Sequence, residues 1–79
     1  MTYRVNPENI ARIAVQTMGD LGEGQFDRME IILGLAETIA RIIATTAKTP
    51  IEAQQCVSVM NAHVSETLRA GYTAKGFNV

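Results

Sequence analysis

The stretch between residues 29 and 47 constrains the fold most, because it is apolar on almost every side. At about 100° per residue, the charged residues Glu30, Glu37 and Arg41 fall on one narrow strip, and apolar side chains occupy the rest of the helix circumference. Glu37 and Arg41 have the i,i+4 spacing of a helical ion pair. We predict a helix over residues 25–47 that buries most of its surface against other helices.

A shorter helix is expected before the central one. Asn6 followed by Pro7 is typical of a helix N-terminus, because the asparagine side chain accepts from a backbone N–H and proline needs no N–H partner at the first position. Gly19 is the expected end, since glycine favours conformations outside the helix. We predict a helix over residues 7–18, followed by a flexible glycine-rich loop over residues 19–24.

A third helix is expected after the central one. Thr49 and Glu52 have the spacing of a capping box, in which the Glu52 carboxylate accepts from the Thr49 N–H. Gly71 is a suitable residue to end the helix. The prediction is a helix over residues 50–70 and a flexible or packed C-terminal tail over residues 71–79.

These elements predict an all-α fold in a single helical domain over residues 1–79. No stretch of useful length shows the strict alternation of a half-buried strand. Because only Lys48 and the cap residues separate the second and third helices, we expect a short N-terminal helix followed by a long antiparallel helical hairpin.

A chain of 79 residues needs stabilisation beyond its own core, since one small hydrophobic core supplies only about 3–5 kcal/mol. Cys56 is the single cysteine, which excludes an intramolecular disulfide. We therefore predict an oligomeric bundle, with copies meeting on the central helix, where small residues permit close approach. The predicted oligomer interface consists of Met29, Ile32, Ala36, Ile39, Ala40, Ile43 and Ala44.

A possible ligand or partner contact lies at the open end of the predicted hairpin. Phe26 and Arg28 begin the second helix, while Tyr72 and Lys75 follow the third, so the two pairs are expected to converge. A guanidinium, an ammonium group and aromatic faces suit a small anionic or nucleotide-like ligand. The alternative is that Phe26 and Tyr72 only plug the end of the hairpin.

Composition and spacing argue against several function classes. Seven Lys and Arg against eight Asp and Glu give no basic field for a nucleic acid polymer. Cys56 and His63 lie about 10 Å apart along one helix, too far for a nucleophile pair, so no catalytic residue, metal or cofactor is expected. Glu37 and Arg41 interrupt the apolar run and argue against a membrane span. No apolar segment follows Arg4, so a cytoplasmic location is expected.

The plan of a short helix, a glycine-rich loop and a long apolar hairpin resembles small helical proteins that assemble into oligomers, some of them phage-encoded proteins that inhibit or sequester components of bacterial defence systems. The resemblance covers the hairpin and transfers no site residues; for a phage protein it implies the host-cell cytoplasm. We expect a non-enzymatic protein that self-associates through the central helix and binds or inhibits a protein partner. The alternative is an oligomer that binds or sequesters a small anionic or nucleotide-like ligand.

Overall fold

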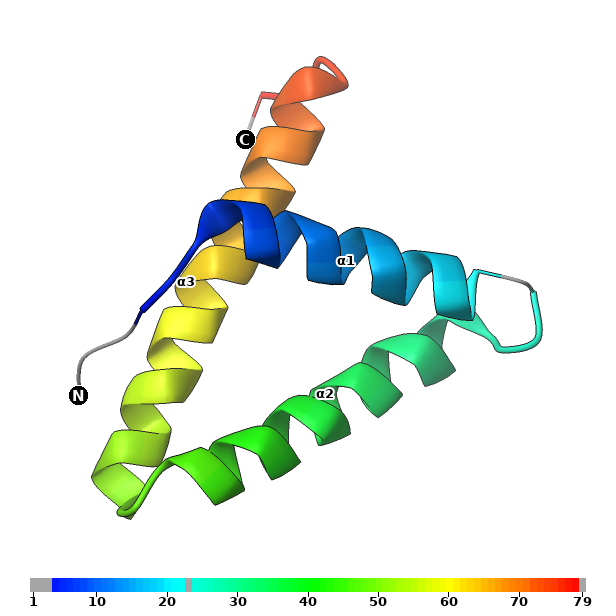
Figure 1. The fold of residues 1–79 in the computed structure, drawn as a ribbon. Coiled ribbons are helices and arrows are strands. Elements are labelled where there is room, and N and C mark those ends of the chain that lie inside the picture. Colours follow the sequence, from blue (N-terminus) through cyan, green and yellow to red (C-terminus); the bar gives the residue numbers. More distant parts are fainter. Residues whose placement is uncertain (1–3, 23, 79) are drawn as a thin grey trace. The chain divides into compact units, whose positions relative to one another are not determined.

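The computed structural model describes residues 4–22 and 24–78, and this part of the chain is all-helical (Figure 1). Its elements are α1 (Pro7–Leu21), α2 (Arg28–Thr46) and α3 (Pro50–Ala74). The prediction of an all-α fold is confirmed. The chain divides into two compact units, Met1–Arg41 and Ile42–Val79, so that α1 and most of α2 belong to the first unit and α3 belongs to the second.

The first helix, α1, begins as predicted but ends later. The Oδ1 atom of Asn6 accepts a hydrogen bond from the Glu8 N–H at 2.9 Å, and Pro7 occupies the first helical position. The predicted end at residue 18 is wrong, because α1 continues through Gly19 to Leu21. A glycine inside a helix costs only about 1 kcal/mol relative to alanine, and the half-buried Leu21 favours another turn.

The second helix, α2, starts at a cap that the sequence analysis overlooked. The Asp27 carboxylate accepts from the Met29 N–H at 2.9 Å, and the Glu30 carboxylate accepts from the Asp27 N–H at 2.8 Å. This reciprocal pair satisfies two backbone donors at the helix start. The predicted start at residue 25 is therefore wrong, and α2 begins at Arg28 and ends at Thr46, one residue before the predicted end.

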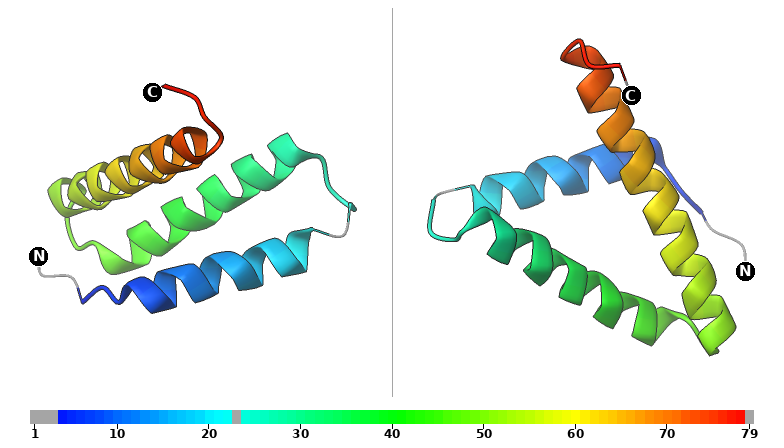
Figure 2. Two further views of the ribbon diagram at one scale, coloured as in Figure 1. Left: turned by 90° about the horizontal axis from the view of Figure 1, so that it is seen from above. Right: turned by 180° about the vertical axis from the view of Figure 1, so that it is seen from behind.

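Within the first unit, the chain reverses direction between α1 and α2 (Figure 2). The connecting loop requires a glycine at Gly24, whose φ of 77° lies in the left-handed region. Near the loop, Leu21 of α1 and Ile31 and Leu35 of α2 are half-buried. The sequence analysis predicted the loop but did not predict that α1 would pack on α2.

In the second unit, α3 begins at the predicted threonine cap with one altered hydrogen bond. The Thr49 hydroxyl accepts from the Glu52 N–H at 3.2 Å, as predicted. The Glu52 carboxylate accepts from the Lys48 N–H at 2.8 Å, so the predicted bond to the Thr49 N–H is wrong. Lys48 lies in the turn outside the helices, where a side-chain acceptor satisfies its backbone donor.

The end of α3 lies beyond the predicted residue 70, because Gly71 continues the helix. The true stop is Gly76, whose φ is 92°. Its N–H donates to the Thr73 carbonyl at 3.0 Å, and the Phe77 N–H donates to the Tyr72 carbonyl at 3.0 Å. These are the two hydrogen bonds of a Schellman motif. Residues 71–78 therefore form a capped helix end rather than a separate tail, while Val79 lies outside the described residues.

Both units lack a fully buried residue: none of residues 4–22 and 24–78 is buried. The half-buried positions of α2 recur at every fourth residue, and the half-buried positions of α3 stop at Met60. The antiparallel hairpin of α2 with α3 would join the two units and stays a prediction.

Candidate interaction surface

The α2 helix carries three different faces in the first unit. Ile31, Leu35 and Ile39 form a half-buried ridge at i,i+4 spacing, and the first two line grooves together with Leu21 of α1. The polar face carries the predicted ion pair, with Arg41 Nη2 at 3.0 Å from Glu37 Oε2. Both side chains of this pair are mostly exposed, so the pair decorates a solvated surface and contributes little stability.

The third face of α2 is apolar and more than half exposed at its large residues. Met29 and Ile32 are each 56% exposed and Leu33 is 61% exposed, and the small residues Ala36 and Ala40 are exposed as well. At about 100° per residue, this face lies roughly a third of a turn away from the ridge of Ile31 and Leu35. We call Met29, Ile32, Leu33, Ala36 and Ala40 the α2 apolar face. It is the candidate site for contact with another helix.

The predicted oligomer interface matches this face only in part. Ile39 and Ile43 are half-buried within the chain, and Ile43 and Ala44 belong to the second unit. Leu33 was missing from the prediction although it is the most exposed large residue of the face. A signal was present in the sequence, because positions 29, 33, 36 and 40 follow the 4-3-4 spacing of a coiled-coil seam. The exposed members of the predicted interface are Met29, Ile32, Ala36, Ala40 and Ala44.

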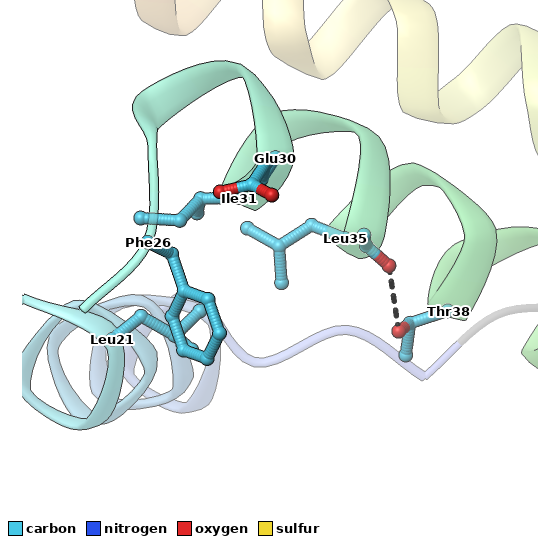
Figure 3. Close-up of a pocket in the computed structure, with 7 residues that line it drawn as sticks. Leu21, Phe26, Glu30, Ile31, Leu35 and Thr38 are labelled. Carbon is cyan, nitrogen blue, oxygen red and sulfur yellow. Dashed lines mark hydrogen bonds between the residues drawn. The ribbon is translucent and has the colours of Figure 1, made fainter.

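A groove of about 310 Å³ lies beside the polar face of α2 (Figure 3). The aromatic ring of Phe26 and the branched side chains of Leu21 and Leu35 face one another there. The polar groups at its rim hold intramolecular hydrogen bonds: Glu30 accepts from the Asp27 N–H, and the Thr38 hydroxyl donates to the Gly34 carbonyl at 2.9 Å. The groove therefore offers apolar contact more than polar recognition. Its lining residues are Leu21, Phe26, Glu30, Ile31, Gly34, Leu35 and Thr38.

A second groove, of about 390 Å³, lies on the other side of the ridge. It shares Leu21, Ile31 and Leu35 with the first groove and adds Met18 from α1. Ile32 lines it and also belongs to the α2 apolar face. The apolar surface of the first unit is thus continuous from the second groove to the α2 apolar face.

The four residues predicted to contact a ligand are divided between the two units. Phe26 lines the first groove and Arg28 the second, both in the first unit. In the second unit, Lys75 Nζ lies 5.7 Å from the centroid of the Tyr72 ring, at cation–π distance. The structure brings Tyr72 and Lys75 together, and the convergence of the two pairs stays a prediction.

Tyr72 has a further role that the sequence analysis did not predict. Its ring centroid lies 5.7 Å from that of Phe77, with an angle of 88° between the planes. This edge-to-face contact is the apolar contact that commonly accompanies a Schellman motif. A pocket of about 160 Å³ also lies here, lined by Thr67, Leu68, Gly71, Tyr72 and Lys75.

Two other kinds of site are absent from the described residues. Within residues 4–22 and 24–78, no three His, Cys, Asp or Glu side chains gather closely enough to hold a metal ion. None of the helices in the described part of the chain combines the length and apolar character needed to cross a bilayer. No protein-family model, curated protein or solved structure matches the chain.

Proposed function

We propose that the protein is a non-enzymatic interaction protein that self-associates through α2 and presents its remaining surface to a protein partner. The observation that carries the proposal is the α2 apolar face, on which three large side chains and two alanines are exposed along one side of a helix. Exposed apolar residues that gather on one face are typical of interaction sites, whereas single exposed ones are ordinary.

Burial of the α2 apolar face would offset much of the free-energy cost of association. Full burial of a Met, Ile or Leu side chain contributes about 1.5–3 kcal/mol. At exposures of 56, 56 and 61%, covering Met29, Ile32 and Leu33 in two copies contributes about 5–10 kcal/mol. This gain is comparable to the cost of about 4–15 kcal/mol that association carries in lost freedom, so net affinity needs further contacts. Contacts of Ala36 and Ala40 with the other copy would add dispersion energy because alanines let helices approach closely.

A second copy is the partner that best explains the lack of buried residues in the described chain. Ile32 and Leu33 on the α2 apolar face are more than half exposed, although residues of their type are usually buried in a folded domain. Association is then the route by which the chain completes a core. A second copy is present wherever the protein itself is present.

The predicted antiparallel hairpin of α2 and α3 belongs to the same proposal. The connection between Thr46 and Pro50 is short, and helices joined by short connections pack as antiparallel neighbours. Such packing would leave the outward side of α3 for the protein partner. That side consists of Gln54, Ser58, Asn61, Ser65 and Arg69, which are all exposed.

Sedimentation of the intact chain across a micromolar concentration series tests the self-association. We expect a concentration-dependent oligomer, and we expect Leu33→Asp to shift it to monomer because the new carboxylate would lose its hydration in the interface. Ser58→Asp is the matched control, since it adds the same charge on the outward side of α3. A stable monomer of the native chain, or an equal shift by both variants, would rule the proposal out.

A second candidate function, binding of a small anionic ligand, is favoured by the pairing of Lys75 with Tyr72 beside a pocket. We propose nucleotides and inorganic phosphate as the probes for a thermal-shift experiment. A ligand at 100 times its Kd stabilises the folded state by about 2.7 kcal/mol. Lys75→Gln should abolish the shift, while Lys48→Gln should retain it. No shift with any probe would exclude this function.

A further inference from the structure

We propose that two copies pair their α2 helices in antiparallel orientation, with Leu33 of one copy against Ala36 of the partner subunit. This inference rests on the proposed self-association and adds its orientation and register. The same register places Met29 opposite Ala40 of the partner subunit. All four positions lie in the first unit and on the α2 apolar face.

The distribution of side-chain size along the seam carries the inference. The two N-terminal positions, Met29 and Leu33, are large, and the two C-terminal positions, Ala36 and Ala40, are small. In the antiparallel pair, every layer combines one large side chain with one alanine. The helix axes can therefore keep one separation, in a range of about 8–10 Å set by the side chains at the contact, and the layers fill evenly.

A parallel pair would fill the same seam unevenly. It would place Met29 and Leu33 against their own copies at one end and Ala36 and Ala40 against theirs at the other end. The first end would need a wide separation and the second a narrow one. Cavities or overpacking would result, and both reduce stability.

The residues that flank the seam support the antiparallel pair. On one flank, Ile32 would meet Ile39 of the partner subunit, so that an exposed and a half-buried isoleucine cover each other. A parallel pair would instead place Ile32 beside Glu37 of the partner subunit. The other flank would bring Glu30 beside Glu37 of the partner subunit at the solvated edge, where Arg41, at 3.0 Å from Glu37, supplies the counter-charge.

Disulfide trapping distinguishes the two orientations. Cys56 is first replaced by alanine, and Met29→Cys and Ala40→Cys are made in that background with tags of different size. Positions 29 and 40 are about 16 Å apart along a helix, far beyond the Cα separation of about 4.4–6.8 Å that a disulfide spans. Mild oxidation of the mixed variants should therefore give mainly the heterodisulfide, and each variant alone should give little product. Ser58→Cys serves as the control for random collision.

The outcomes separate the orientation from the self-association beneath it. Dominant heterodisulfide supports the antiparallel pair. Dominant homodisulfide from Met29→Cys alone would overturn the orientation while leaving the self-association intact. An oligomer by sedimentation in which neither product exceeds the Ser58→Cys control would also overturn it, because α2 would then not pair in this way. A monomer by sedimentation of the parent protein would overturn both proposals.

Discussion

The two units differ in what they leave incomplete. In the first unit, Leu21, Ile31 and Leu35 gather between α1 and α2, yet two apolar grooves and the α2 apolar face remain open. In the second unit, the last part of α3 beyond Met60 has no half-buried residue, yet its end is closed by the two hydrogen bonds of the Schellman motif. The backbone hydrogen bonds that end α3 therefore form in a region where no side chain is half-buried. Local hydrogen bonds determine where these helices begin and end, and burial is what the proposed self-association would add.

The largest predicted effect tests whether the partial core of the first unit carries stability. Leu35→Ala removes a half-buried side chain that lines both grooves, and we expect a loss of about 2–3 kcal/mol. Leu68→Ala on the exposed part of α3 should cost less than about 1 kcal/mol, since its side chain is 55% exposed. Urea unfolding at one fixed protein concentration measures both, because the proposed self-association would make the stability concentration-dependent. Equal losses would mean that the two units do not differ in burial.

The next prediction compares two kinds of glycine. Each unit contains a glycine with positive φ and a glycine inside a helix. Gly24→Ala and Gly76→Ala place a side chain at φ of 77° and 92°, and each should destabilise the chain by about 1–2 kcal/mol. Gly34→Ala and Gly71→Ala lie inside helices with no atom within 4 Å of the added Cβ. They should stabilise by about 0.5–1 kcal/mol. Thermal unfolding should show opposite signs within each unit, and the same sign for all four variants would contradict the helix ends described above.

The helix starts were predictable from sequence where a cap depends on a few neighbouring residues. Asn6 and Thr49 act as predicted, because a side chain that accepts from an N–H two or three residues later needs only local geometry. Asp27 and Glu30 offered the same signal, but Glu30 had been assigned to the polar strip of α2 alone. The helix ends at Gly19 and Gly71 were wrong because a glycine stops a helix only when the following residues stabilise the left-handed conformation, as Phe77 does after Gly76.

The candidate site was less predictable, for a physical reason. A helix that is apolar on most sides can place several different ridges against a neighbour, so its pattern does not say which ridge contacts α1. The structure places Ile31 and Leu35 there and leaves Leu33 exposed, a division that the sequence pattern alone did not indicate. Contacts between helices distant in sequence depend on loop geometry that periodicity does not contain.

The smallest predicted effect compares the two capping arrangements directly. Asp27→Ala in the first unit and Thr49→Ala in the second each remove a side-chain acceptor for a backbone N–H at a helix start, and each should cost about 1 kcal/mol. Asp27→Ser and Thr49→Ser retain an acceptor and should cost little, which separates capping from other effects of the substitution. Both variants keep a glutamate bond at the helix start, because Glu30 still accepts from the backbone N–H of residue 27 and Glu52 from that of Lys48, each at 2.8 Å, so the two starts should fray to a similar extent. Hydrogen exchange of the Met29 and Glu52 amides measures this fraying, and much faster exchange at one of the two would show that the glutamate contact there does not hold the helix start.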